Sequence, residues 1–452
     1  MNPRLFPLLA LALAGAGCQQ TAPPALAQNP DAEGVRPQAQ TQPAALDAFL
    51  GKTEPAYKWS DATPDFAGDG FANLRLTSQT WQGRDWSHRL QVFKPQAGLK
   101  FPDAAILNVS FGQGSLPESV LGQGIADVSG AYLVNVFQVP NQPLYDRQED
   151  ALVAYSFQKY LETGDASWPL LLPMTKSVTK AMDALQAWSK KNTGQEIKRF
   201  IVTGASKRGW TAYLVAAGDK RVVGAIPVVY DNLNIPAQIK HQREVWKETS
   251  QAAVEFSKLG LMDEGATGST RGRELLASVD PYSYMSRLTM PILSVNATND
   301  GYWPHDAQRI YRDELSKTTQ LSTYYAPNST HFLGEQIVPL AQSAAVWSRL
   351  VLSGDPVPTL GLTREGAAFR ATPSGTPSAV RLWIATSETR DFRQARWSPL
   401  PMTKTANGWT ANVSEAQLAP HAAVFAQAAW TVPGTPSPLV LASPMWTSED
   451  GQ

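Results

Sequence analysis

Cysteine is almost absent from this sequence, which contains a single one, Cys18, among 452 residues. A lone cysteine excludes an internal disulfide, and no CxxC or HExxH motif suggests a structural or catalytic metal. Lysines and arginines number 39, as do aspartates and glutamates, so the chain lacks the basic surplus typical of nucleic-acid-binding proteins. A glycine-rich phosphate loop is missing too. We therefore expect no metal, no cofactor and no nucleic-acid partner.

Long hydrophobic runs are missing as well. The most apolar stretch, residues 5–14, follows Arg4 and is too short for a membrane-spanning helix of about 20 residues. It is typical of an export signal, which we place at residues 1–18. The letters LALAGAGC resemble a bacterial lipobox, in which Cys18 would be acylated, although Gly15 replaces the usual leucine. An alternative is ordinary cleavage after Ala27, which would remove the cysteine.

Residues 19–44 are rich in glutamine, proline and alanine, which is typical of a flexible tether. Together with the signal and the lipobox-like cysteine, this segment predicts an exported protein of the cell envelope, anchored to the membrane by lipid on Cys18. The first 44 residues are then separate from the folded part of the chain.

Strand-like and helical patterns alternate through residues 45–355. Apolar runs at 88–93, 105–109 and 131–139 predict strands, and helical periodicity covers 150–162 and 175–191. This alternation predicts an α/β domain with a mostly parallel sheet and helices on both faces. Residues 232–290 form a polar, helix-patterned insertion, either a cap over the substrate pocket or a peripheral addition. Residues 356–447 show only short strands, which predict a small immunoglobulin-like β-sandwich that either recognises a ligand or packs on the first domain.

The sequence GASKRG, between an apolar strand and a small-residue helix, resembles the turn on which a serine hydrolase presents its nucleophile. Ser206 is the candidate nucleophile, and the backbone N–H of Lys207 would face the developing oxyanion. The chain departs from the strict GxSxG pattern, because its second glycine is Gly209, one position late, and Arg208 takes the usual place. An alternative interpretation is an ordinary strand-turn-helix unit in which the serine caps the helix.

An acid and a base follow in the order that the α/β-hydrolase fold requires. Asp300 ends one apolar run and His331 ends the next, and the chain has only five histidines from which a base can be drawn. Each has a plainer alternative, Asp300 as a turn former and His331 as a helix cap. Asp231, after the preceding strand, is the best competing acid. Gly112 and Gln113, after an early strand, are candidates for the second oxyanion donor, with an ordinary glycine turn as the alternative.

Several longer motifs resemble, in series, the PhoPQ-activated pathogenicity-related protein family of the PqaA type. They are QVPNQPL, EDALVAYSFQKYLETGDASWPLLLPMTKSVTKAMDAL, VTGASKRGWT, YDNLN, VDPYSY and NATNDGYWPHD. The resemblance implies an α/β-hydrolase in the cell envelope or outside the cell, with Ser206, Asp300 and His331 as its triad. It also implies distant kinship with prolyl-oligopeptidase-like serine peptidases, and it does not define a substrate.

Polar residues after the strand that ends near Val139 are candidates for binding substrate: Asn141, Gln142, Glu149 and Asp150. Carboxylates beside the nucleophile would suit the amino terminus of a peptide. Alternatively, the two acids only oppose a helix dipole, and Arg208 either binds a substrate carboxylate or pairs with one of them. The sequence thus predicts a serine hydrolase, a peptidase of aminopeptidase or dipeptidyl-peptidase-like type. The alternatives are a carboxylesterase and a weakly active envelope protein with a binding or signalling role.

Overall fold

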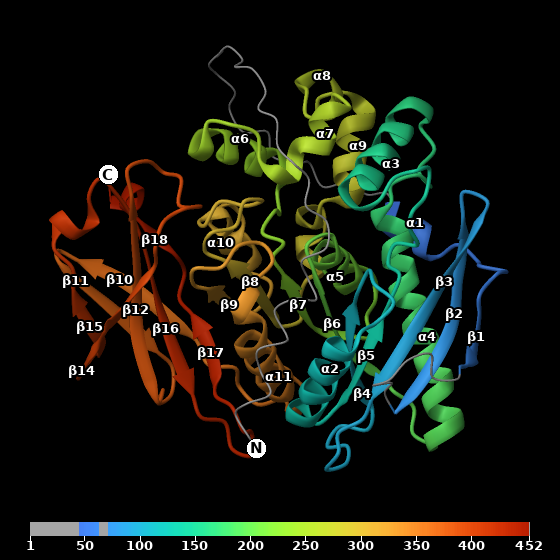
Figure 1. Cartoon of the computed structure of the whole chain (residues 1–452), viewed down its shortest axis with the longest axis horizontal. Helices are drawn as coiled ribbons and strands as arrows, with labels where there is room; N and C mark the ends of the chain where they lie inside the picture. Colours follow the sequence, from blue (N-terminus) through green and yellow to red (C-terminus); the bar gives the residue numbers. More distant parts are fainter. Residues whose placement is uncertain (1–44, 63–70, 452) are drawn as a thin grey trace.

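The computed structural model describes residues 45–62 and 71–451 (Figure 1). The predicted signal, Cys18 and the tether of residues 19–44 lie outside the described residues and remain predictions. No helix in the described part of the chain is long and apolar enough to cross a bilayer.

Six parallel strands form the centre of the main sheet, in the order β5-β4-β6-β7-β8-β9. Their bounds are β4 (Ala104–Val109), β5 (Tyr132–Val136), β6 (Arg199–Ala205), β7 (Val222–Val228), β8 (Ile292–Ala297) and β9 (Leu321–Ala326). Beyond β5 the sheet continues with three antiparallel strands, β3 (Arg84–Phe93), β2 (Ala72–Trp81) and β1 (Lys58–Asp61). The crossing of β4 and β5 in an otherwise sequential order is the topology of an α/β-hydrolase, as predicted.

Helices cover both faces of this sheet (Figure 1). One layer contains α1 (Ala45–Leu50), α4 (Leu171–Thr193) and α5 (Lys207–Gly218), and the other contains α2 (Leu116–Ser129) and α11 (Ile337–Ser353). Neighbouring strand residues serve opposite layers: Leu107 and Val202 belong to the core with α4 and α5, whereas Ile106 and Ile201 belong to the core with α11. Because both sheet faces are buried, these strands read as continuous apolar runs in the sequence.

The strands after α11 do not form a separate body. β17 (Leu439–Ala442) pairs antiparallel with β9, joining Ala442 to Thr323, and the main sheet then continues through β16 (His421–Trp430), β12 (Ala379–Ser387) and β13 (Ser398–Pro401). β18 (Trp446–Thr447) also pairs with β16. A second sheet contains β10 (Leu360–Glu365), β11 (Ala368–Pro373), β15 (Gly408–Asn412) and β14 (Thr403–Thr405). The predicted sandwich therefore has two sheets, but one continues the hydrolase sheet and shares a core with it.

The predicted insertion at residues 232–290 is helical and lies at the carboxyl edge of the parallel strands, together with α3 (Glu149–Thr163) (Figure 1, top). It contains α6 (Ile235–Trp246), η2 (Gln251–Ala253), α7 (Val254–Lys258), α8 (Glu264–Thr267), α9 (Thr270–Val279) and η3 (Pro281–Arg287). The buried carboxylate of Asp280 holds its two ends together by accepting hydrogen bonds from the backbone of Ile235 at 2.7 Å and Tyr282 at 2.9 Å. The shorter helices elsewhere are η4 (Ala307–Ile310), α10 (Arg312–Leu315), η5 (Gly334–Gln336), η6 (Glu415–Leu418) and η7 (Ser448–Gly451).

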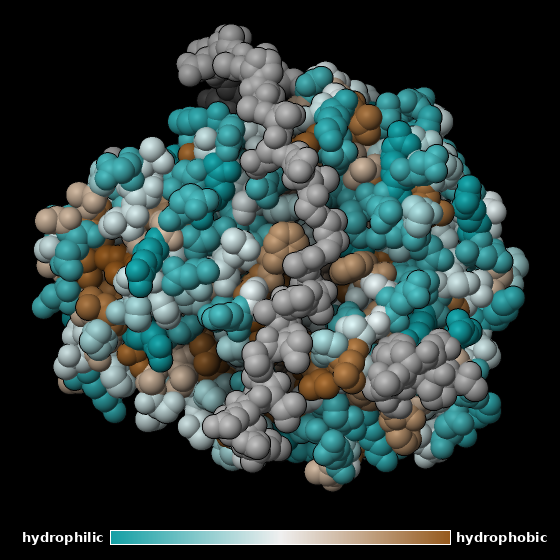
Figure 2. Space-filling view, in the orientation of Figure 1, coloured by the Kyte–Doolittle hydropathy of each residue, from teal (hydrophilic) through white to brown (hydrophobic). Residues whose placement is uncertain are grey.

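The face seen in Figure 2 is largely hydrophilic, and its apolar atoms form small, separate patches. Among the described residues, the large apolar side chains that are more than one third exposed are Phe71, Phe111, Leu116, Val120, Val254 and Phe332.

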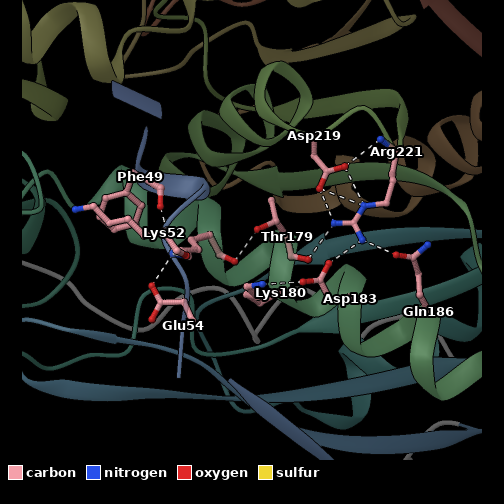
Figure 3. Close-up of polar contacts among 10 residues, drawn as sticks. Phe49, Lys52, Glu54, Thr179, Lys180, Asp183, Gln186, Asp219 and Arg221 are labelled. Carbon is pink, nitrogen blue, oxygen red and sulfur yellow. Dashed lines mark hydrogen bonds and ion pairs between the residues drawn. The ribbon is translucent and has the colours of Figure 1, made fainter. Parts of the chain in front are cut away.

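Two polar clusters attach α4 to its surroundings (Figure 3). Lys176, fully buried, donates hydrogen bonds to the carbonyl of Lys52 at 2.7 Å and to Glu54 at 2.5 Å. Arg221, just before β7, donates to Asp183 on α4 at 2.8 Å and to Asp219 at 2.6 Å. Because a buried charge is costly unless it is paired, both clusters contribute to the position of α4.

Candidate active site

Ser206 lies on a sharp turn between β6 and α5. Its backbone has φ 57° and ψ −125°, a conformation that is strained for a residue other than glycine and typical of a nucleophile elbow. A Cβ atom on Gly204 would lie 2.8 Å from the carbonyl oxygen of Arg208, and one on Gly209 would lie 3.0 Å from that of Val228. Gly209 therefore lets the helix pass close to β7, which explains why the second glycine of the motif can stand one position late.

Asp300 and His331 are in direct contact. The Nδ1 atom of His331 lies 2.9 Å and 3.1 Å from the two carboxylate oxygens of Asp300, and both residues are buried. Because a carboxylate only accepts hydrogen bonds, Nδ1 is the donor, and in the neutral ring Nε2 is then an acceptor. Nε2 is buried and has no hydrogen-bond partner among the described residues. The acid and base predicted from the sequence are thus paired as a triad requires.

Tyr302 completes the support of this histidine. Its ring stacks on His331 with centroids 3.9 Å apart and an interplanar angle of 13°, and its backbone N–H donates to Asp300 at 2.7 Å. Tyr302 and Ser206 line the same cavity. Tyr302 was not among the site residues predicted from the sequence, although its position two residues after Asp300 could have indicated a place in the site.

Asp231, the competing acid, has a different partner. It follows β7 and accepts a hydrogen bond of 2.6 Å from the hydroxyl of Tyr311. Burial raises the pKa of Asp231 to about 7, against the lowering effect of the Tyr311 hydrogen bond. Of the other buried histidines, His241 contacts Asp306 at 2.7 Å and His88 contacts Ser78 at 2.9 Å, whereas His305 packs on the ring of Phe392 and its Nε2 has no partner among the described residues. His331 with Asp300 is the histidine-carboxylate pair that Tyr302 links to the cavity of Ser206.

The candidate oxyanion donors lie on neighbouring segments. Lys207 is the first residue of α5, where a backbone N–H has no carbonyl of an earlier turn to bind. Gly112 and Gln113 follow β4, the strand beside β6, and their carbonyls accept hydrogen bonds from Gln138 at 3.2 Å and Arg89 at 3.0 Å. Neither bond involves the backbone N–H of Gly112 or Gln113, so the oxyanion role of this loop remains a prediction.

Arg208 connects the elbow to three other segments. It donates two hydrogen bonds of 2.6 Å to Glu149 and one of 2.8 Å to the carbonyl of Val139, and its guanidinium lies 5.1 Å from the ring centroid of Phe111. Phe111 belongs to the loop that also contains Gly112. The residue that breaks the GxSxG pattern therefore ties the nucleophile turn to the candidate oxyanion loop and to the start of α3.

Glu149 and Asp150 lie beside the elbow, as the sequence predicts, but both are paired. Lys207 contacts Glu149 at 2.6 Å and Asp150 at 3.0 Å. Burial alone would raise the pKa of Glu149, but the hydrogen bonds and charges of Arg208 and Lys207 hold it well below its usual value. The two acids and two bases compensate one another. A substrate ammonium group therefore meets no free carboxylate in this cluster.

Asn141 and Gln142 have structural partners. Asn141 accepts from the backbone N–H of Ser87 at 2.7 Å and donates to the carbonyl of the same residue at 2.8 Å, which fixes the loop after β5 to β3. Gln142 accepts a hydrogen bond of 2.9 Å from the N–H of Glu149 and donates to its carboxylate. Both amides hold the loop that positions Glu149.

A cavity of about 110 Å³ opens beside Ser206, between the elbow and the helical insertion. Its lining is mostly apolar and comes from α3, α5, α6, α7, α9 and the segment after Asp300. The residues that matter for its chemistry are Trp210, Tyr230, Ile235, Ile239, Gln242 and Trp303. The insertion thus covers the substrate side of the nucleophile, which favours the cap over the peripheral alternative.

The strand order and the sharp turn at Ser206 together define the α/β-hydrolase fold. Within that class, the chain belongs to the PhoPQ-activated pathogenicity-related protein family, whose model matches residues 46–393. It is also 30% identical over 407 residues to autocrine proliferation repressor protein A of Dictyostelium discoideum, an alignment that covers 80% of this chain and 81% of that protein.

Two solved structures are more distantly similar. Acetyl xylan esterase 1 from Thermoanaerobacterium sp. JW/SL YS485 has 13% identity and a TM-score of 0.48, over 67% of this chain and 92% of that one. A puromycin-hydrolyzing peptidase of Mycobacterium tuberculosis has 13% identity and a TM-score of 0.40, over 62% of this chain and 40% of that one. These similarities concern the course of the backbone and carry no information on substrate.

Proposed function

We propose that this protein is a serine hydrolase that cleaves an ester or amide through an acyl-enzyme. In this mechanism Ser206 attacks the carbonyl, His331 accepts its proton at Nε2 and returns it to the leaving group, and Asp300 holds the imidazole in the required tautomer. The observation that carries the proposal is the buried His331, bonded to Asp300 through Nδ1 and without a partner at Nε2.

The apo arrangement is compatible with this chemistry. His331 makes no hydrogen bond to Ser206, and in many hydrolases the catalytic bond tightens only when substrate binds. The N–H of Lys207 and one N–H from the loop of Gly112 and Gln113 would stabilise the oxyanion. Tyr302, stacked on the imidazole, acts as a positioning residue, because it limits the rotation of the ring.

An esterase is the better supported substrate class. Glu149 and Asp150, the residues from which the sequence suggested an aminopeptidase, are neutralised by Lys207 and Arg208. The mostly apolar cavity supports a substrate with an apolar group next to the scissile bond. Peptide hydrolysis remains the alternative, and the relative from Dictyostelium, by its name, favours a signalling role as a second candidate.

Labelling with a fluorophosphonate probe tests the function directly. We expect the wild-type protein to be labelled at Ser206 and Ser206→Ala to be unlabelled with an unchanged thermal unfolding midpoint. A wild-type protein that is folded but neither labelled nor active on p-nitrophenyl acetate would overturn the proposal and would leave the signalling candidate.

We propose further that the protein is exported and held at the cell envelope by lipid on Cys18. The proposal rests on the short apolar stretch of residues 5–14 and on the sequence before the cysteine. Lipoprotein anchoring needs more than one acyl chain, because a single chain binds membranes only marginally.

A further inference from the structure

The helix α6 presents one face to the cavity beside Ser206. Ile235, Ile239 and Gln242 all line it, and their spacing of four and three residues places them on the same side of a helix. The start of α6 is held by Asp280, which accepts from the N–H of Ile235 at 2.7 Å. This wall of the cavity is therefore anchored to the rest of the insertion.

The two tryptophans that line the cavity, Trp210 and Trp303, have hydrogen-bond partners for their indole N–H groups. The indole N–H of Trp210 donates to the carbonyl of Val279 at 2.5 Å, and that of Trp303 donates to the carbonyl of Val229 at 3.0 Å. The ring of Trp210 stacks on Tyr230 with centroids 5.2 Å apart. Because both indole donors are satisfied, these side chains offer apolar faces to a ligand.

Gln242 is a polar residue on the insertion side of this lining. It is only 5% exposed, yet its side-chain amide makes no hydrogen bond within the described part of the chain. Gln238, one turn earlier, donates to the carbonyls of Ala307 at 2.9 Å and Leu233 at 3.3 Å, while its Oε1 is buried without a partner among the described residues. Because the amide of Gln242 is not sealed off from solvent, unlike the partnerless Oδ1 of Asn232 in the same lining, it is open to hydrogen-bond a polar atom of a ligand in the cavity.

The position of His331 indicates which part of the substrate enters the cavity beside Ser206. The leaving group must lie near Nε2 of His331 to receive its proton. Ser206 lines the cavity, but His331 does not; only Tyr302, on which it stacks, reaches it. The cavity therefore lies on the acyl side of the scissile bond.

We propose that this cavity binds a compact apolar acyl group, about as large as one aromatic ring with a short linker, and that Gln242 hydrogen-bonds a polar atom on that group. The size follows from the volume of about 110 Å³, which is comparable to cavities of roughly 150 Å³ that hold benzene. The proposal rests on the serine-hydrolase function proposed above.

The first test measures kcat/KM for p-nitrophenyl acetate, butyrate, phenylacetate and decanoate. We expect each methylene that fits the cavity to raise kcat/KM about fourfold, which corresponds to about 0.8 kcal/mol, and the rate to fall at decanoate. Ala252→Phe, which adds a ring to the cavity lining, should lower the ratio of phenylacetate to acetate hydrolysis at least tenfold. Val254→Phe is the matched control, because Val254 is exposed and lies outside the cavity.

The second test addresses Gln242 with two esters that differ in one hydroxyl. We expect the wild type to hydrolyse p-nitrophenyl 4-hydroxyphenylacetate about ten times faster than the phenylacetate ester, because one hydrogen bond contributes about that factor. Gln242→Leu should abolish this preference. Hydrolysis of the phenylacetate ester serves as the internal control, since its acyl group has no polar atom for the amide.

The outcomes separate the two proposals. Loss of all labelling and hydrolysis in the wild type would overturn the serine-hydrolase function itself. Normal acetate hydrolysis with a flat response to acyl length, or with equal effects of Ala252→Phe and Val254→Phe, would overturn only the acyl site. An unchanged hydroxyl preference in Gln242→Leu would remove Gln242 from the proposal.

Discussion

The guanidinium of Arg208 donates two hydrogen bonds of 2.6 Å to the carboxylate of Glu149, joining the residue two positions after Ser206 to the first residue of α3. Bidentate pairs of this kind combine charge with fixed geometry. Since Arg208 also contacts Val139 and Phe111, the pair sets the distance between the nucleophile turn and the candidate oxyanion loop.

Breaking this pair should lower turnover more than it lowers substrate binding. We expect Arg208→Lys and Glu149→Gln each to reduce kcat for p-nitrophenyl acetate about tenfold with KM changed less than about threefold, because lysine keeps the charge but not the bidentate geometry. The double variant should lose little more than either single one, since both disrupt one contact. Asp150→Asn, which removes a contact of Lys207 but leaves the Arg208–Glu149 pair intact, is the control. A change in KM alone would contradict the positioning role.

The acid of the triad can be identified by comparing two aspartates. Asp300→Asn should reduce kcat about 10⁴-fold, because the imidazole loses the carboxylate that fixes its tautomer. Asp231→Asn should leave kcat within about threefold, since Asp231 bonds to Tyr311. Kinetics on p-nitrophenyl acetate, with circular dichroism as the check on folding, would measure both. The reverse order of effects would move the acid to Asp231.

Asp231 should also make the protein less stable as the pH rises. Its pKa of about 7 in the folded state lies above the ordinary value of 3.8, so the folded state keeps a proton that the unfolded state has released. The free energy of unfolding contributed by this group therefore falls between about pH 4 and pH 7. Urea unfolding at pH 4.5 and pH 8 should show Asp231→Asn gaining stability relative to the wild type at the higher pH. An equal difference at both values would refute this assignment.

His88 should act in the opposite direction. Burial lowers the pKa of His88 to about 4, below its ordinary 6.5, so between these values the unfolded state binds a proton that the folded state excludes. Stability should fall as the pH drops from 6.5 to 4, by up to about 3 kcal/mol from this residue, since one pKa unit corresponds to about 1.4 kcal/mol. His88→Gln should flatten this part of the pH profile, measured by urea unfolding at pH 4.5 and pH 6.5.

Peptide substrates provide the test of the aminopeptidase alternative. Because Glu149 and Asp150 are paired with Lys207 and Arg208, we expect free-amine and N-acetylated peptide p-nitroanilides to be cleaved at rates within about twofold of each other, and both more slowly than p-nitrophenyl esters. A preference of tenfold or more for the free amine would show that a substrate ammonium displaces one of the bound cations.

The lipid anchor predicts a change of location. Cys18→Ser should convert a membrane-associated protein into a soluble exported or unprocessed one, measured by fractionation of cells that express each form. Unchanged membrane association would exclude acylation at Cys18, and an amino terminus at Gln28 in the wild type would assign cleavage after Ala27 instead.

Local patterns were sufficient to predict much of this architecture. The strands at 88–93 and 105–109 fall in β3 and β4, and the helices at 150–162 and 175–191 fall in α3 and α4, so these predictions are confirmed. The strand predicted at 131–139 contains β5, which is shorter and ends at Val136. Long runs with a clear period identify such elements because burial on one or both faces dictates the spacing of apolar residues. The elbow and the chain order of Ser206, Asp300 and His331 were equally readable, because they follow strand ends.

Tertiary structure decided what the candidate residues contact. Two acids near an elbow look the same in sequence whether they are free or paired, and only packing shows that Arg208 and Lys207 neutralise Glu149 and Asp150. The continuation of the main sheet into β17 depends on one long-range pairing between Ala442 and Thr323, which no local period reveals. The sequence by itself determined the elements and the order of the reactive groups, since these depend on neighbours along the chain. The cavity, the charge pairing of the site and the joined sheets depend on residues far apart in the chain, which only the folded structure brings together.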